Sequence, residues 1–190
     1  LKAGDTMTLD QALHILLMYS ANDAAMLIAE NIGGSVDHFV EMMNDRAAEL
    51  GCSSTHFANP NGLPNPDHYV TARDMALIAR AAYQYPAIKY DSFNEIIHMT
   101  SYQTAYYDKD GKAKELTVNN TNRFLRGDFQ APENITVIGG KTGTTNAAGH
   151  CLILLSRDTS GAPYISVILN SSASDVLYPE MVQLLEQINK

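Results

Sequence analysis

The chain has 190 residues, enough to bury a substantial core, and its composition of 45% hydrophobic and 18% charged residues is typical of a folded globular domain. Its formal net charge of −8, from 13 basic and 21 acidic residues, argues against a nucleic-acid-binding surface. No stretch is apolar for long enough to cross a membrane, and neither a methionine nor a signal peptide opens the sequence.

Helical periodicity dominates the first third of the chain. Thr8 and Gln11 have the spacing of a capping box and begin a helix that we expect to end near Tyr19. The turn-forming residues Ser20–Asp23 separate it from a second helix, and a third helix is predicted to end at Gly51. Short polar side chains are predicted to cap the first, third and fourth helices: Thr8, Ser35 and Thr71.

A long loop rich in Asn, Pro and Gly is predicted over residues 52–70, followed by a helix that ends before Pro86. Cys52, His56 and His68 lie in this loop at spacings that a metal ion could use. No second close pair completes a tetrahedral set, so we predict no metal site. In the following helix, Asp74 is expected to serve as a helix cap and Arg73 as a surface charge.

The second half of the chain reads mainly as β-structure. Short β-like runs, including residues 95–102 and 114–118, surround a polar turn at 108–111. Three buried strands joined by hairpin-type links then favour antiparallel pairing, and an amphipathic helix ends the chain. These three strands are predicted at 136–138, 151–155 and 164–169. Cys151 is expected to be a small core residue, and a disulfide between Cys52 and Cys151 stays open.

This order of elements predicts a single α+β domain over residues 1–190, with an antiparallel sheet flanked by helices. Residues 1–92 are expected to be mainly helical, and residues 93–190 to form the sheet and the C-terminal helix.

The triplet Lys141-Thr142-Gly143 follows a pair of glycines and could end a phosphate-binding loop of the pattern G-x-x-x-x-G-K-[ST]. That pattern requires a glycine where this chain has Ile135, and no helix pattern follows the lysine. The alternative is an edge strand beside an active-site cleft. In that strand Gly143 lets a substrate approach the backbone, Thr142 offers a hydroxyl, and Lys141 supplies a positive charge for a carboxylate.

A second short motif, Ser20-Ala21-Asn22, lies at the junction of the first two helices. Alone it is weak, because Ser20, Asn22 or Asp23 could simply cap the second helix. Together with a later K-T-G, however, an S-x-N triplet belongs to the motif set of β-lactamases and penicillin-binding proteins.

With these motifs, the chain resembles the low-molecular-mass penicillin-binding proteins that act as serine-type D-alanyl-D-alanine carboxypeptidases. The resemblance runs through most of the chain in the family's order. It rests on "LLMYSANDAAMLIAENIGGS", "FVEMMNDRAAELG", "THFANPNGL", "HYVTARDMALIAR", "NTNRFL" and "GGKTGTTNAAGHCL". It implies a β-lactamase/transpeptidase-like fold and an acyl-enzyme reaction that releases the terminal D-alanine of peptidoglycan stem peptides. It also implies inhibition by β-lactams.

By resemblance, three residues have catalytic roles. Ser20 joins the proton-transfer network around the nucleophile, Asn22 hydrogen-bonds the substrate amide, and Lys141 supports electrostatics and proton transfer.

Three further residues are implied to bind the substrate. Thr142 contacts its carboxylate, Gly143 permits its strand-like approach, and the backbone amide of Thr144 is one of two oxyanion donors.

The family's nucleophile and its partner lysine, in the motif S-x-x-K, have no counterpart in this sequence. No lysine of the chain has a serine three positions before it. We therefore expect a partial catalytic domain that lacks its N-terminal strands and is inactive alone.

Two other functions stay open on sequence grounds: a non-catalytic relative that binds peptidoglycan peptides, and a β-lactamase or esterase on the same fold. The expected partners are peptidoglycan stem peptides and β-lactams, with no cofactor, no metal and no nucleic acid. Uncovered sheet edges predict self-association. The resemblance implies an extracytoplasmic location in the bacterial cell envelope.

"NTNRFL" is expected to be a structural turn in which Asn120 and Asn122 form hydrogen bonds with the backbone. His150 is expected to be a surface or strand-end residue.

Overall fold

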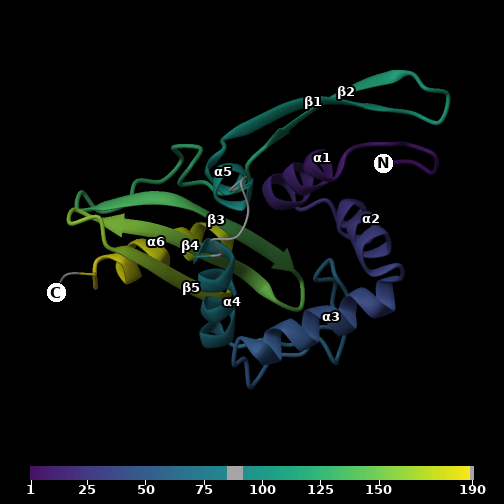
Figure 1. Cartoon of the computed structure of the whole chain (residues 1–190). Coiled ribbons are helices and arrows are strands. Elements are labelled where there is room, and N and C mark those ends of the chain that lie inside the picture. Colours follow the sequence, from purple (N-terminus) through teal and green to yellow (C-terminus); the bar gives the residue numbers. More distant parts are fainter. Residues whose placement is uncertain (85–91, 189–190) are drawn as a thin grey trace.

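A computed structural model describes residues 1–84 and 92–188 (Figure 1). Its helices are α1 (Leu9–His14), the π-helical turn η1 (Ile15–Tyr19), α2 (Asn22–Gly33), α3 (Val36–Glu49), α4 (Ala72–Gln84), α5 (Ser92–His98) and α6 (Ser174–Leu185). Its strands are β1 (Ser101–Tyr107), β2 (Ala113–Asn119), β3 (Ile135–Thr145), β4 (Gly149–Asp158) and β5 (Pro163–Ser171). The predicted end of the fourth helix before Pro86 lies outside the described residues.

The predicted caps of three helices are confirmed. Thr8 and Gln11 form a reciprocal capping box at the start of α1. Ser35 accepts a hydrogen bond from the amide of His38 at the start of α3, and Thr71 accepts one from the amide of Asp74 in α4. The sequence signals of these caps are local, which is why they could be read correctly without the fold.

The strands form two antiparallel sheets. β1 and β2 make a hairpin that extends beyond α1, and β3, β4 and β5 make a three-stranded sheet in which β4 is central (Figure 1). The predicted antiparallel pairing of the last three strands is confirmed. β3 is longer than the predicted 136–138 and includes the whole K-T-G triplet at one edge of the sheet, as the sequence analysis expected.

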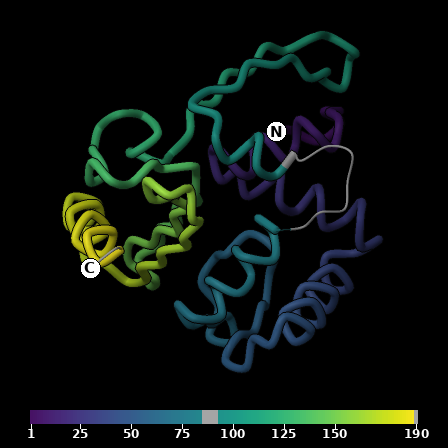
Figure 2. The backbone as a smooth tube through the Cα atoms, turned by 60° about the vertical axis from the view of Figure 1, so that its left-hand side comes forward, coloured from purple at the N-terminus to yellow at the C-terminus, as the bar shows by residue number. Residues whose placement is uncertain are grey.

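Helices cover both faces of the three-stranded sheet. Leu152 and Leu154 of β4 are fully buried against α6, in a cluster that includes Tyr178. Side chains alternate between faces along a strand, so Leu155 points the other way and lines a pocket with Ala76 of α4. Figure 2 shows α6 beside the sheet and the chain curving from α1 through α3 to α4. The α+β class predicted from the sequence is therefore confirmed.

One predicted strand is wrong. Residues 95–102 were expected to be extended, yet α5 occupies Ser92–His98 and β1 begins only at Ser101. The β-branched pair Ile96 and Ile97 favours a strand locally. Both are 1% exposed, Ile96 packs with Met18 of η1 and Val118 of β2, and Ile97 lies against Gly139 of β3. Tertiary packing therefore overrides the local preference.

The pair Gly139-Gly140 allows two close backbone approaches. A Cβ atom on Gly139 would lie 2.6 Å from the carbonyl oxygen of Ile97 in α5, and one on Gly140 would overlap the carbonyl oxygen of Ile153 in β4. α5 and β4 can therefore pack tightly against the strand that carries K-T-G. Within the described part of the chain, no helix has the length and apolar character needed to span a bilayer.

Candidate active-site cleft

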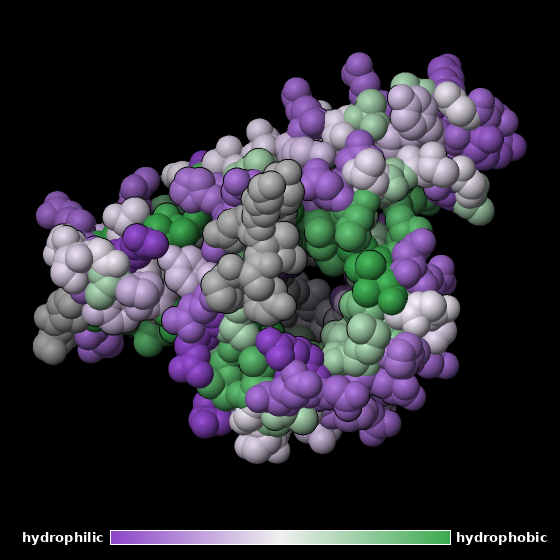
Figure 3. All heavy atoms as spheres, in the orientation of Figure 1, coloured by the Kyte–Doolittle hydropathy of each residue, from purple (hydrophilic) through white to green (hydrophobic). Residues whose placement is uncertain are grey.

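A cleft of about 850 Å³ opens between the S-A-N corner and the K-T-G strand. It is walled by η1, the start of α2, the loop before α4, the turn after β2, the end of β3 and the start of α6. Figure 3 shows the molecular surface hollowed between the sheet and the helices, with hydrophobic residues gathered beside the hollow. The cleft lining includes all six site residues predicted from the sequence: Ser20, Asn22, Lys141, Thr142, Gly143 and Thr144.

The S-A-N corner is shaped by an unusual helix end. After the π-helical turn η1, Ser20 adopts φ 64° and ψ 41°, a left-handed conformation that few residues other than glycine take up. Its amide donates a 3.0 Å hydrogen bond to the carbonyl oxygen of Leu16. Ala21 is the N-cap of α2 and has no side-chain capping bond, so capping by Ser20 or Asn22 is wrong, whereas Asp23 accepts a 3.0 Å hydrogen bond from the first-turn amide of Ala24. The corner instead presents Ser20 and Asn22 to the cleft.

Lys141 connects the two motifs. Its Nζ donates hydrogen bonds to Ser20 Oγ and, at 2.7 Å, to the carbonyl oxygen of Thr142. Burial disfavours the charged ammonium and lowers the pKa of Lys141 to about 8. A lysine with this pKa can both hold and release a proton near neutral pH, which is the requirement for proton transfer.

The next residues of β3 present a hydroxyl and an open backbone. Thr142 Oγ1 lies 2.5 Å from Thr121 Oγ1, a hydrogen bond in which either atom can be the donor. At Gly143 the nearest side-chain atom to an added Cβ would be Cys151 Cβ at 3.8 Å, so this stretch of strand is accessible from the cleft. Thr144 Oγ1 lies 3.4 Å from His150 Nδ1 at the strand end.

Cys151 corrects one expectation. It was predicted to be a core residue, but it is half-buried and lines the cleft opposite Gly143. Its location follows from the register of β3 with β4, which the sequence does not fix. Cys151 and Cys52 are both free thiols in the structure.

Asp74 has a different role from the one expected. It is 1% exposed, and its carboxylate accepts hydrogen bonds from the Ser54 amide at 2.8 Å and the Thr55 hydroxyl at 2.9 Å. The bond from the Ser54 amide is the main cause that holds the pKa of Asp74 below its usual range. Asp74 therefore anchors the start of the loop over residues 52–70. Further along, Asn44 bonds both backbone groups of Phe57 at 2.8 and 2.9 Å.

That anchored loop forms the far wall of the cleft, through Phe57, Asn59–Leu63 and His68. Its histidines serve the loop's own backbone: His56 bonds the carbonyl oxygen of Asp67, and His68 accepts from the amide of Ala58. Nowhere in residues 1–84 and 92–188 do three His, Cys, Asp or Glu side chains gather as a metal site would require.

The turn after β2 holds cleft residues that carry no recognisable sequence signal. Its asparagines bond the backbone as expected: Asn120 accepts from the amide of Asn122, and Asn122 accepts from the amide of Phe124. The cleft is lined, however, by six residues of this turn and of α6 that neither S-x-N nor K-T-G includes: Thr121, Arg123, Arg126, Ser174, Leu177 and Tyr178. The segment "NTNRFL", one of those that carry the resemblance, includes Thr121 and Arg123 but none of the others.

The sequence matches the family described as D-alanyl-D-alanine carboxypeptidase over residues 1–173. The carboxypeptidase DacF of Bacillus subtilis is 32% identical over 188 residues, which are 98% of this chain and 44% of the relative. DacC of Escherichia coli is 31% identical over 97% of this chain and 42% of its own length. The chain thus spans less than half of the length of these relatives.

Solved structures agree with the sequence comparison. The crystal structure of the Streptomyces K15 DD-transpeptidase superposes with a TM-score of 0.82 at 29% identity, covering 98% of this chain and 69% of that one. A D-alanyl-D-alanine carboxypeptidase from Mycobacterium tuberculosis superposes with a TM-score of 0.77 at 29% identity, covering 95% of this chain and 63% of that one. The fold is therefore that of the DD-peptidases.

Proposed function

Because this chain belongs to the D-alanyl-D-alanine carboxypeptidase family, we propose that it forms one wall of a serine-type active site that removes the terminal D-alanine from peptidoglycan stem peptides. The observation that supports this most strongly is the hydrogen bond from Lys141 to Ser20. It brings together two motifs that lie 121 residues apart, in a cleft that also contains Thr142 and Gly143.

The proposed reaction proceeds through an acyl-enzyme, in which Lys141 and Ser20 take part in proton transfer. A serine oxygen attacks the carbonyl carbon of the D-alanyl-D-alanine bond, and the leaving D-alanine takes up a proton as the acyl ester forms. We propose that Lys141 and Ser20 relay that proton; their shared hydrogen bond and the pKa of Lys141, about 8, support this role. Water then hydrolyses the ester and restores the serine.

The remaining residues hold the substrate. Thr142 offers its hydroxyl to the terminal carboxylate, and Asn22 offers its side-chain amide to the peptide. Gly143 lets the substrate lie along β3, and the amide of Thr144 faces the developing oxyanion. We propose that β-lactams bind in the same cleft, because their carboxylate and reactive amide resemble the carboxylate and scissile amide of the peptide substrate. The proposal also places the protein outside the cytoplasm, in the bacterial cell envelope.

The attacking serine must come from an S-x-x-K segment, which the sequence does not contain. Intact-mass spectrometry after incubation with benzylpenicillin tests this directly. We expect no covalent adduct on the 190-residue chain, and stoichiometric acylation with release of D-alanine from a peptide substrate when an S-x-x-K segment precedes Leu1. A stable acyl adduct on the chain alone would contradict the assignment, as would failure of the joined protein to react.

Self-association is a further prediction of the partial domain. Within the described residues β5 pairs only with β4, so its other edge presents unpaired backbone groups. We expect dimers or larger species whose proportion rises with concentration in light scattering coupled to size exclusion. Replacing Val167, on β5, with proline removes a backbone amide from this strand and should lower the associated fraction. A monodisperse monomer at millimolar concentration would contradict this prediction.

A further inference from the structure

We propose that Thr121 is a positioning residue that aims the hydroxyl of Thr142 at the carboxylate of the bound peptide, an inference that rests on the function proposed above. Thr121 lies outside both sequence motifs. Its Oγ1 is 2.5 Å from Thr142 Oγ1, and both residues line the cleft.

The chemistry of paired hydroxyls carries the argument. Each hydroxyl has one proton to donate and two lone pairs that accept. If Thr121 donates to Thr142, the proton of Thr142 is free to point into the cleft. A carboxylate is a stronger acceptor than a neutral hydroxyl, so binding of the substrate carboxylate favours this arrangement. The hydrogen bond from Thr121 to Thr142 and the one from Thr142 to the carboxylate then polarise each other. Among the described residues, the hydroxyl of Thr121 is the hydrogen-bond partner of the Thr142 hydroxyl, so its removal leaves that rotamer without this constraint.

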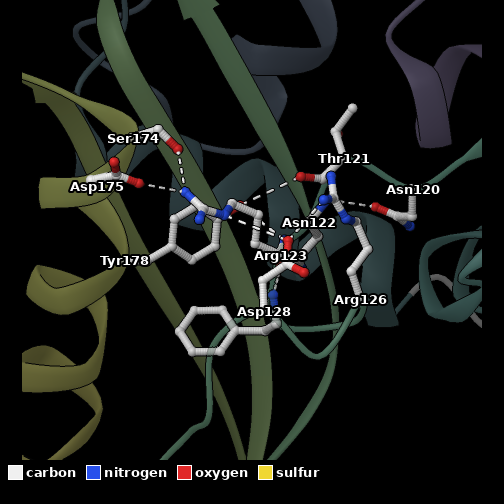
Figure 4. Close-up of polar contacts among 10 residues, drawn as sticks. Asn120, Thr121, Asn122, Arg123, Arg126, Asp128, Ser174, Asp175 and Tyr178 are labelled. Atoms are coloured by element: carbon white, nitrogen blue, oxygen red, sulfur yellow. Dashed lines mark hydrogen bonds and ion pairs between the residues drawn. The ribbon is translucent and has the colours of Figure 1, made fainter.

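Thr121 is suited to this role because its backbone is held on two sides. Its amide donates a 3.1 Å hydrogen bond to the carbonyl oxygen of Met18, two residues before Ser20. Its carbonyl oxygen accepts a 3.5 Å bond from the hydroxyl of Tyr178 in α6 (Figure 4). Thr121 therefore connects the S-A-N corner, the K-T-G strand and α6 through its three polar groups.

Arg123 fixes the same turn to α6. Its guanidinium donates to Asp175 at 2.8 Å and to Ser174 at 3.1 Å, and it lies over the ring of Phe129 at 4.6 Å (Figure 4). The amide of Arg123 also donates to the Tyr178 hydroxyl at 3.0 Å. These contacts hold the turn without the Thr121 hydroxyl, so removing that hydroxyl should leave the turn in place.

The test compares peptides that end in a carboxylate or a carboxamide. The wild-type chain, Thr121→Val and Thr121→Ser are titrated with Nα-acetyl-L-lysyl-D-alanyl-D-alanine and with its C-terminal carboxamide, following amide shifts by NMR. We expect Thr121→Val to weaken carboxylate binding about fivefold to tenfold and to leave carboxamide binding within twofold. Thr121→Ser, which keeps the hydroxyl, should restore the carboxylate preference.

Thr117→Val, an exposed threonine of β2, is the matched control and should change neither affinity. Thr121→Ala keeps the backbone contacts and cannot overpack, so it replaces the valine variant if that one fails to fold. A folded valine or alanine variant that keeps the wild-type preference for the carboxylate overturns the role of Thr121 alone. A wild-type chain that binds neither peptide overturns the proposed function together with it.

Discussion

Replacing Lys141 with methionine is expected to stabilise the fold at pH 7 while removing its chemistry. Methionine fills a similar volume without a charge, and burial already opposes the charge of Lys141, whose pKa is about 8. We expect the free energy of unfolding to rise by about 1 to 3 kcal/mol. In a protein that also contains S-x-x-K, penicillin acylation should slow by about 10²- to 10⁴-fold.

The stability difference should depend on pH in one direction. Between pH 8 and the ordinary lysine pKa of 10.5, the unfolded chain binds more protons at this site than the folded chain. The wild-type free energy of unfolding therefore rises with pH across this window, and the advantage of Lys141→Met is full below pH 8 and absent above 10.5. Urea unfolding of the wild type and of Lys141→Met at pH 7 and at pH 10.5 measures this difference in the free energy of unfolding. Equal stability of both proteins at pH 7 would contradict burial of the charge.

Alanine in place of Gly140 should destabilise the domain by about 3 kcal/mol. The added Cβ would overlap the carbonyl oxygen of Ile153, an atom of the paired strand β4. β4 cannot move away cheaply, because Leu152 and Leu154 on it are fully buried against α6. Urea denaturation of the variant at neutral pH measures the loss, and an unchanged midpoint would mean that β3 and β4 are not as close as described.

Gly143→Ala is the matched control for that experiment. Its Cβ would meet only Cys151 Cβ at 3.8 Å, an ordinary contact, so stability should change by less than about 0.5 kcal/mol. Peptide binding should nevertheless weaken, since the methyl group faces the cleft where the substrate is proposed to lie. We therefore expect Gly140 to be required for the fold and Gly143 to be required for peptide binding.

The sequence predicted those features whose signals are local. The caps at Thr8, Ser35 and Thr71 depend on side chains next to the helix they begin, and the structure confirms each. The K-T-G strand was also predicted correctly, because Ile135 excluded a phosphate loop and no helix pattern follows the lysine. Pairing this strand with the S-A-N corner required the family resemblance, since 121 residues separate Lys141 from Ser20.

Features that depend on tertiary contacts were not predicted. α5 appeared to be a strand because Ile96 and Ile97 favour one, and only their packing against η1 and β3 decides for a helix. Asp74 appeared to be a simple cap, although its carboxylate is buried under the loop that it anchors. Thr121 lies in a turn with no catalytic signature, and its contact with Thr142 forms only when that turn lies against β3.

We propose above all that the cleft between the S-A-N corner and the K-T-G strand recognises a D-alanyl-D-alanine terminus. The most direct measurement is an NMR titration of the isotopically labelled chain with Nα-acetyl-L-lysyl-D-alanyl-D-alanine, and with the same peptide ending in L-alanyl-L-alanine. We predict saturable shifts at the amides of Asn22 and residues 142–144 with the D,D peptide, and much weaker shifts with the L,L peptide. An unperturbed cleft, or equal responses to both peptides, would contradict the claim.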